Sequence, residues 1–131
     1  MNKTVLIVDD DPIVRLILQK MIHNFNSSVI CHQCDNGYEG LAVLETLQNA
    51  TDAIVVLLDI NMPVLNGWEF LDSLQKINLD SFNTFQLYIV SSSTDESDKV
   101  KAQSYPVIKN FYHKPLSQQD IEEILNSHEI T

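Results

Sequence analysis

The sequence predicts an α/β protein in which a parallel five-stranded sheet lies between two layers of helices. Five short apolar segments alternate with five segments that carry apolar residues at helical spacing. The most apolar strand, Ala53–Leu58, shows no alternation and is typical of a central strand covered on both faces. The length of 131 residues suits one domain, so we expect residues 1–131 to form a single unit without an effector domain.

The amino-terminal part of the chain predicts a strand followed by a capped helix. Val5–Val8 is short and rich in β-branched residues, which favours a buried strand. Asp11 is a preferred N-cap residue, and Pro12 then occupies the first helical position, where proline is tolerated. The apolar residues that follow define one helical face: Val14, Ile17, Leu18, Met21, Ile22 and Phe25. We expect this face to pack on the sheet.

The middle of the chain predicts two further strands and two helices. The second strand, the turn after it and the leucines of the second helix are Ser28–Cys34, Asp35–Gly37, and Leu41, Leu44 and Leu47. The third strand, the breaks after it and the apolar residues of the third helix are Ala53–Leu58, Met62-Pro63 and Asn66-Gly67, and Phe70, Leu71 and Leu74. The breaks fall where a strand must give way to a helix, as an alternating β and α order requires.

The carboxyl-terminal part predicts two more strands, each followed by a helix. The strands are Leu87–Val90 and Asn110–His113. Ser93 and Glu96 have the spacing of a capping box and predict the start of the fourth helix, whose apolar face is weak. Ser117 and Asp120 have a similar arrangement and predict the start of the last helix. The apolar residues of that helix are Ile121, Ile124 and Leu125.

The composition limits the classes of function. The chain has 8 Lys plus Arg against 18 Asp plus Glu, and a net charge of −10 argues against nucleic acid as a direct partner, because phosphate binding needs a basic surface. The longest apolar run is far too short to cross a bilayer, and the amino terminus lacks the pattern of a signal peptide. The 2 cysteines make no disulfide framework. We therefore expect a soluble cytoplasmic protein without a membrane partner.

Polar residues directly follow four of the five predicted strands. They are three carboxylates, one hydroxyl and one lysine: Asp9, Asp10, Asp59, Ser91 and Lys114. In a parallel α/β sheet the carboxyl ends of the strands meet at one edge, where ligands bind. We therefore expect these side chains to converge.

Such a cluster has a defined chemistry. Three carboxylates repel one another unless a cation compensates them, and Mg²⁺ suits hard oxygen ligands and keeps several waters. With Lys114 nearby, the site would attract a further dianion such as a phosphoryl group, to which the Ser91 hydroxyl could donate. Asp59, between metal and lysine, is then a candidate nucleophile, since carboxylates form aspartyl phosphates. Phosphoryl transfer requires mainly positioning and charge neutralisation, and this set supplies both.

Four parts of the chain, taken in order, resemble the receiver domain of two-component response regulators. They are Leu6–Asp10, Leu57–Pro63 with Gly67, Ser91, and Lys114-Pro115. The resemblance extends from about Thr4 to Leu125, and the ordered set is far more specific than any single piece. It implies the family fold, a flavodoxin-like three-layer sandwich whose five-stranded parallel sheet has the order 2-1-3-4-5.

The resemblance also implies a role for each matched residue of the site. Asp59 corresponds to the phosphoacceptor aspartate. Asp9 and Asp10 correspond to the acidic Mg²⁺ ligands, joined by Asp59 and by the backbone carbonyl of Asn61. Lys114 corresponds to the lysine that pairs with the phosphoryl group.

A switch and a set of partners follow from the same resemblance. Ser91 matches the switch hydroxyl, and Phe111 matches the aromatic residue that turns inward when the hydroxyl moves toward the phosphate. A sensor histidine kinase or a histidine phosphotransfer protein would donate the phosphoryl group. Output would pass to a downstream protein, because the chain has no room for an effector domain. The sequence leaves open whether phosphorylation also drives a homodimer.

Tyr105–Ile108 departs from the family pattern, which usually has a small Gly-Ala pair here, so the fourth helix and its surface are the least determined part of the fold.

Cys31 and Cys34 form a C-x-x-C spacing, but no further zinc ligands are evident and the pair lies in a predicted strand. We expect strand packing, with the two sulfurs on opposite faces.

Two other functions remain as alternatives at this point. The first is an Mg²⁺-dependent phosphatase with an aspartate nucleophile, of the haloacid dehalogenase type. Those enzymes have a D-x-D motif after the strand, and its second acid protonates the leaving group. This chain has Asp59-Ile60-Asn61, and asparagine cannot act as that acid. The second is a binding module that has lost phosphorylation, which usually lacks an acid or the lysine. We expect a signalling switch that is not an enzyme beyond its own phosphorylation and dephosphorylation.

Overall fold

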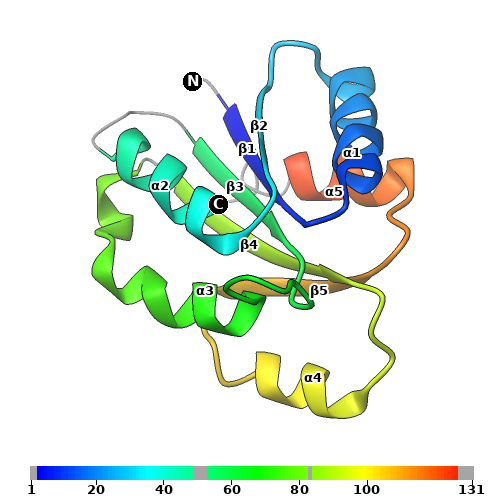
Figure 1. The fold of residues 1–131 in the computed structure, drawn as a ribbon. Helices are drawn as coiled ribbons and strands as arrows, with labels where there is room; N and C mark the ends of the chain where they lie inside the picture. Colours follow the sequence, from blue (N-terminus) through cyan, green and yellow to red (C-terminus); the bar gives the residue numbers. More distant parts are fainter. Residues whose placement is uncertain (1–2, 49–52, 83, 127–131) are drawn as a thin grey trace.

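The chain forms a five-stranded parallel sheet between two layers of helices (Figure 1), as predicted. The structure is a computed structural model that describes residues 3–48, 53–82 and 84–126. The strand order is β2-β1-β3-β4-β5, and every neighbouring pair of strands is parallel. This is the order that the resemblance implied.

Helices follow the strands in strict alternation along the chain. The strands are β1 (Lys3–Val8), β2 (Ile30–Cys34), β3 (Ala53–Leu58), β4 (Thr84–Ser91) and β5 (Ile108–His113). The helices are α1 (Pro12–Phe25), α2 (Gly37–Leu47), α3 (Gly67–Ser73), α4 (Glu96–Ala102) and α5 (Gln118–Asn126), with short 3-10 helices η1 (Leu74–Lys76) and η2 (Leu79–Ser81) after α3. Among the described helices, none combines the length and the apolar character that a membrane crossing requires.

Alternate residues of the central strands face the two helical layers. On one face, Leu6 and Val8 of β1 pack in the same cluster as Phe70 of α3. On the other face, Ile7 packs in the same cluster as Ile22 of α1. All six residues of β3 are buried, which confirms that this strand is covered on both faces. The two layers hold the strand ends in fixed register.

The predicted starts of α1 and α5 are confirmed. Oδ1 of Asp11 accepts hydrogen bonds from the backbone N–H groups of Ile13 and Val14, at 2.9 and 3.4 Å. At α5, the N–H of Ser117 donates to Asp120 Oδ2 and the N–H of Asp120 donates to Ser117 Oγ, both at 3.0 Å. These bonds satisfy N–H groups that have no partner inside a helix.

The predicted start of α4 was wrong. Asp95, rather than Ser93, is the N-cap residue, and it accepts a hydrogen bond from the N–H of Ser97 at 2.9 Å. The Ser93 hydroxyl instead donates to Asp98 Oδ2 at 2.6 Å. Aspartate caps helices at least as well as serine, so the later candidate displaced the earlier one and α4 begins at Glu96.

Several other limits differ from the predicted ones. β4 already begins at Thr84 and includes Ser91 as its last residue, β5 begins at Ile108, and β2 begins only at Ile30. Strand limits depend on pairing with the neighbouring strand, which the composition of one segment does not encode. In α1, Ile17 is 51% exposed because the sheet covers only part of the predicted apolar face.

The segment after β3 is held by a close backbone contact. The N–H of Gly67 donates to the carbonyl of Ile60 at 3.1 Å, and a Cβ atom on Gly67 would lie only 2.6 Å from the Cα of Ile60. Glycine alone permits this approach. The amino-terminal end of α3 is therefore packed directly against the residue that follows Asp59.

Cys31 and Cys34 are free thiols on opposite faces of β2, as predicted. Cys34 belongs to the apolar cluster under α2 and α3, whereas Cys31 packs against the cluster under α1 and α5. Burial raises the pKa of each thiol to about 11. Both side chains are therefore neutral at physiological pH and act as packing residues.

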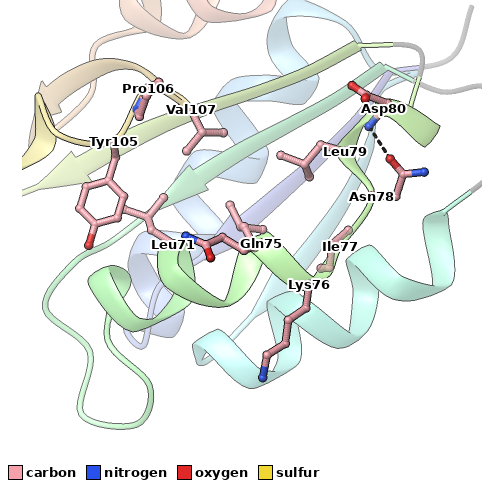
Figure 2. A pocket seen from close by; sticks show the side chains of 11 residues that line it. Leu71, Gln75, Lys76, Ile77, Asn78, Leu79, Asp80, Tyr105, Pro106 and Val107 are labelled. Carbon is pink, nitrogen blue, oxygen red and sulfur yellow. Dashed lines mark hydrogen bonds between the residues drawn. The ribbon is translucent and has the colours of Figure 1, made fainter.

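A surface cavity of about 640 Å³ lies between α3, the two 3-10 helices and residues 105–107 (Figure 2). Its lining is mostly apolar and includes Leu71, Leu79 and Val107. Within it, the side chain of Asn78 accepts a hydrogen bond from the N–H of Asp80 at 3.2 Å. The lining segments immediately precede β4 and β5, so the cavity lies at the amino ends of these strands, away from the predicted site.

Candidate functional site

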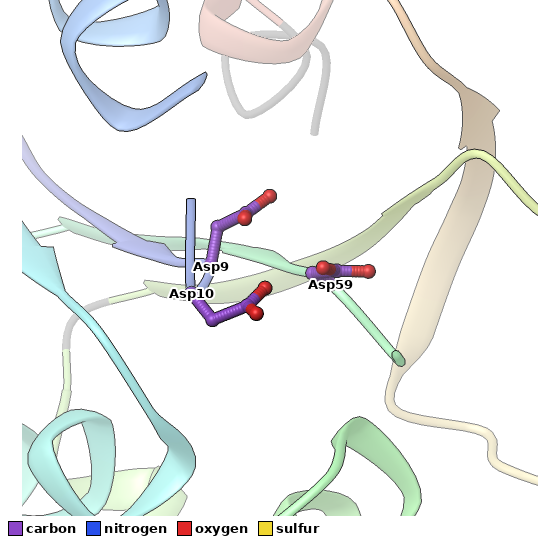
Figure 3. Close-up of side chains that lie close together, drawn as sticks. All are labelled: Asp9, Asp10 and Asp59. Atoms are coloured by element: carbon purple, nitrogen blue, oxygen red, sulfur yellow. The ribbon is translucent and has the colours of Figure 1, made fainter. Parts of the chain in front are cut away.

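Asp9, Asp10 and Asp59 lie together at the carboxyl edge of the sheet (Figure 3). One carboxylate oxygen from each residue lies within 4.8 Å of the others. Asp9 and Asp59 are 3% and 5% exposed, whereas Asp10 is open to solvent. The three acids therefore converge as their positions after the strands indicated.

The register of β1 and β3 explains this convergence. Val8 pairs with Leu58 at the end of the two strands, so the residues that follow, Asp9 and Asp59, are neighbours. The N–H of Asp59 donates to the carbonyl of Val8 at 2.9 Å and extends the ladder by one residue. Two buried carboxylates are thus placed side by side by ordinary strand pairing.

Lys114 brings a positive charge to the same cluster from the end of β5. Its Nζ atom lies 2.7 Å from Asp9 Oδ2 and 3.4 Å from Asp59 Oδ2. The N–H of Lys114 donates to the carbonyl of Ser91 at 2.9 Å, which holds the end of β5 against the end of β4. One ammonium group cannot balance three carboxylates, so the cluster still favours a cation.

Both buried carboxylates also accept hydrogen bonds from the backbone. The N–H of Asp11 donates to Asp9 Oδ1 at 2.9 Å, and the N–H of Asn61 donates to Asp59 Oδ1 at 3.1 Å. These bonds fix one oxygen of each acid. They place Asn61 beside Asp59, and its part as a carbonyl ligand stays a prediction.

The environment raises the pKa of both Asp59 and Lys114. Burial raises the pKa of Asp59 because it disfavours the carboxylate, and the charge of Asp9 adds to this, while the Asn61 N–H and Lys114 oppose it. Burial alone would lower the pKa of Lys114, but its hydrogen bond to Asp9 and the charges of both acids outweigh that effect. Lys114 is therefore a firmly protonated ammonium beside an incompletely balanced carboxylate.

The donor set fits Mg²⁺. All three side chains offer hard oxygen ligands, and the open side at Asp10 leaves room for the waters that Mg²⁺ retains. In the described ranges no other group of three His, Cys, Asp or Glu side chains is arranged to hold a metal ion. Asp11 is adjacent in sequence but lies outside the group, because its side chain caps α1.

Ser91 and Phe111 come from the two strands beyond this cluster. Ser91 is fully buried, and its Oγ accepts a hydrogen bond from the N–H of Ser93 at 3.0 Å. Phe111 pairs with Ile89 in the sheet and packs, half-buried, against the core under α2 and α3. Phe111 also lines a surface cavity of about 360 Å³ that extends to Lys99 of α4.

Sequence reasoning missed Arg15, which contacts the acidic doublet from α1. Its Nη1 donates to the carbonyl of Asp9 at 2.6 Å, and its Nε donates to Gln33 Oε1 at 3.3 Å. Arg15 is the single arginine of the sequence and follows Asp10 by five positions. Its position about one turn into the predicted helix was the signal in the sequence that Arg15 could reach the acidic doublet.

The family described as the response regulator receiver domain matches residues 5–126. The chain belongs to this family. It is a receiver domain of two-component signalling, and the match includes every residue assigned above to the acidic cluster and to the switch.

This receiver domain is similar to two bacterial regulators of different length. Protein PilH from Pseudomonas aeruginosa is 30% identical over 123 residues, and the match covers 94% of each chain. The nitrate/nitrite response regulator protein NarL from Escherichia coli is 32% identical over 99 residues, which are 76% of this chain and 42% of NarL. The chain thus spans nearly the whole of one relative and less than half of the other.

Solved structures support the same fold. A response regulator receiver protein from Dyadobacter fermentans superposes with a TM-score of 0.85 at 22% identity, over 98% of this chain and 99% of that chain. A two component response regulator from Cytophaga hutchinsonii has a TM-score of 0.82 at 26% identity, over 96% of each chain. The receiver domain therefore has the flavodoxin-like architecture that the resemblance implied.

Proposed function

We propose that this receiver domain is a phosphorylation switch in which Asp59 takes a phosphoryl group from a phosphohistidine of a sensor histidine kinase or a histidine phosphotransfer protein. The observation that carries the proposal is the position of Asp59, a buried carboxylate 3.4 Å from the Lys114 ammonium and beside two further acids. An Asp59 oxygen bonds to phosphorus while the P–N bond of the phosphohistidine breaks, and its electron pair returns to the imidazole nitrogen.

Asp9, Asp10 and Asp59 would hold Mg²⁺ in this reaction, with the backbone carbonyl of Asn61 as a further ligand. When bound, the ion would offset the negative charge of the acids and of the phosphoryl oxygens. Backbone N–H groups orient the carboxylates of Asp9 and Asp59, which supports their role as metal ligands.

Lys114 would stabilise the phosphorylated state. Its ammonium contacts Asp9 and Asp59 at present, and a phosphoryl group on Asp59 would add negative oxygens within its reach. Charge-assisted bonds from lysine to phosphate are strong. The raised pKa keeps this group protonated across the physiological range.

Ser91 and Phe111 would carry the change to a protein-binding face. The Ser91 hydroxyl accepts a bond from Ser93, and its own proton is the one that it would donate to a phosphoryl oxygen. Phe111 lines the cavity between β5 and α4, so a change in its ring would alter that surface. Phosphorylation would thereby shift the population between two arrangements of the α4 and β5 surface, which a downstream protein reads.

The proposal includes no turnover of external substrates. Membership of the receiver family does not favour the phosphatase alternative. The residue two positions after Asp59 is Asn61, which cannot protonate a leaving group as the second acid of such a phosphatase does.

Labelling by a small phosphodonor tests the proposal. With acetyl phosphate and Mg²⁺, the intact mass of the wild-type chain should rise by one phosphoryl group, and Asp59→Asn should show no rise. Asp80→Asn, at an exposed aspartate in η2, is the matched control and should be labelled like the wild type. Undiminished labelling of Asp59→Asn would overturn the assignment. Hydrolysis of a generic phosphate ester that Asp59→Ala abolishes would favour the phosphatase instead.

A further inference from the structure

We propose that Arg15 is a positioning residue that holds the peptide group between Asp9 and Asp10, and that it thereby sets the affinity of the acidic cluster for Mg²⁺. The inference rests on the proposed function, because it concerns the same site. Arg15 contacts the backbone of the doublet rather than its carboxylates, so it would act on the cation through Asp9 and Asp10.

The carbonyl of Asp9 lies beyond the last residue pair of the sheet. Pairing of β1 ends at Val8, which faces Cys34 on one side and Leu58 on the other. The N–H of Asp9 still donates to the carbonyl of Cys34 at 3.1 Å. The carbonyl of Asp9 lies beyond the last paired residues and has no partner among the described residues of the sheet. A buried carbonyl needs a hydrogen-bond partner, and Arg15 supplies it at 2.6 Å.

This carbonyl belongs to the peptide group that joins Asp9 to Asp10. Because a peptide group is planar, fixing its oxygen also fixes the direction in which Asp10 leaves the strand. The Asp9 carboxylate has its own restraints in the Asp11 N–H and Lys114. Asp10 is exposed, so the orientation of its carboxylate depends on the backbone more than on packing.

Arg15 is itself held in place. Its Nε donates to Gln33 Oε1 on β2 at 3.3 Å, and Gln33 Nε2 donates to Gln19 Oε1 on α1 at 2.9 Å. The planar guanidinium makes its two bonds in fixed relative directions, which the single ammonium of lysine cannot reproduce. Arg15 therefore joins α1, β1 and β2 at the point where the acidic doublet begins.

Charge and position predict opposite effects for a change at Arg15. A positive charge near the acids repels an incoming cation, so loss of charge alone would tighten Mg²⁺ binding. Loss of a residue that orients metal ligands weakens metal affinity, by about tenfold to 100-fold in known sites. The direction of the change in Mg²⁺ affinity thus separates the two effects.

Calorimetric titration with Mg²⁺ tests the inference. Arg15→Lys and Arg15→Gln should both bind Mg²⁺ about tenfold more weakly than the wild type. Lys20→Gln, which removes an exposed positive charge from the same helix, should leave the affinity unchanged. At saturating Mg²⁺, both Arg15 variants should regain labelling of Asp59 by acetyl phosphate, because the nucleophile is intact.

The outcomes separate the two proposals. Wild-type affinity in Arg15→Lys, or tighter binding in Arg15→Gln, would overturn the role of Arg15 while leaving the phosphorylation switch in place. A wild-type chain that neither binds Mg²⁺ nor is labelled would instead overturn the proposed function. Urea unfolding checks that each variant is folded, and Gln33→Ala, which removes the support of the guanidinium, provides a second variant that should also weaken binding.

Discussion

The ammonium group of Lys114 lies 2.7 Å from Oδ2 of Asp9, although the two residues are 105 positions apart in the chain. The contact joins the ends of β1 and β5 at one edge of the sheet. The side chain of Asp9 is 4% exposed and that of Lys114 is 20% exposed, so water can replace the contact only in part. Loss of Lys114 would therefore leave two buried carboxylates without a compensating charge.

Replacement of the lysine should expose this dependence. We expect Lys114→Gln to lower the free energy of unfolding by about 2 kcal/mol in metal-free buffer, below the full cost of breaking a wholly buried pair because Lys114 is partly exposed. Mg²⁺ should restore part of the loss by balancing the same carboxylates. Urea unfolding measures both effects. Lys109→Gln, at an exposed lysine of β5, is the control, and equal stability of the two variants would contradict the prediction.

The neighbouring residues Asp10 and Asp11 should respond differently to loss of charge. Asp10 belongs to the acidic cluster, whereas Asp11 caps α1. Asp10→Asn should weaken Mg²⁺ binding more than about tenfold, since a direct ligand matters at least as much as an orienting residue. Asp11→Asn keeps an equally good cap and should bind Mg²⁺ almost normally. Titration calorimetry on both variants checks this. A larger loss of Mg²⁺ affinity in Asp11→Asn than in Asp10→Asn would show that the metal ligands are assigned wrongly.

Asp59 should make the fold less stable at neutral pH than an amide would. Its pKa is raised in the folded state, chiefly by burial, so above that pKa the ionised group costs the native state more than the unfolded state. We expect Asp59→Asn to be more stable than the wild type at pH 7, on the order of 1 kcal/mol. The difference should shrink as the pH falls through the folded pKa and vanish below the unfolded pKa.

Urea unfolding across the acid range, in metal-free buffer, measures this pH dependence. Asp80→Asn is again the control, because Asp80 is exposed in η2. A variant Asp59→Asn that is less stable than the wild type at pH 7 would mean that the 3.4 Å contact with Lys114 outweighs burial.

The sequence was sufficient to locate the acidic cluster because the doublet of Asp9 and Asp10 follows one strand and Asp59 follows another. The uninterrupted apolar run Ala53–Leu58 predicts a central strand, so Asp59 was expected at the edge of the sheet. Parallel pairing then placed it beside Asp9. The contact of Arg15 with the Asp9 carbonyl lay beyond this reasoning, because it depends on how a long side chain crosses from α1 to a backbone group.

The region around α4 also depends on tertiary contacts that the sequence did not predict. Tyr105 stacks on Trp68 with ring centroids 5.6 Å apart, and its hydroxyl donates to Asp72 at 3.0 Å. Lys101 lies over the Trp68 ring, 4.8 Å from its centroid. These contacts join α3 to the segment before β5, where the family usually has a small Gly-Ala pair. They are tertiary contacts between distant residues, which periodicity and capping signals do not encode.

Ser93 provides a direct connection between the predicted switch hydroxyl and α4. Its N–H donates to Ser91 Oγ at 3.0 Å, and its hydroxyl donates to Asp98 Oδ2 at 2.6 Å. A hydrogen bond to a carboxylate is worth about 1.5 kcal/mol or more, which corresponds to roughly a tenfold change in an opening equilibrium. We therefore expect Ser93→Ala to raise amide hydrogen exchange in Glu96–Ala102 about tenfold in the unphosphorylated protein.

The neighbouring hydroxyl makes the comparison specific. Ser92 is exposed, and Ser92→Ala changes the same loop without touching the bond to Asp98. Asp98→Ala should reproduce the faster exchange, because it removes the other partner of that bond. If the hydrogen bond from the Ser93 N–H to the Ser91 hydroxyl breaks on phosphorylation, labelling of Asp59 should raise amide exchange in α4 of the wild type. The same labelling should have a smaller effect in Ser93→Ala. Equal exchange in the Ser92 and Ser93 variants would show that α4 is held by its other contacts and that the hydrogen bond transmits nothing.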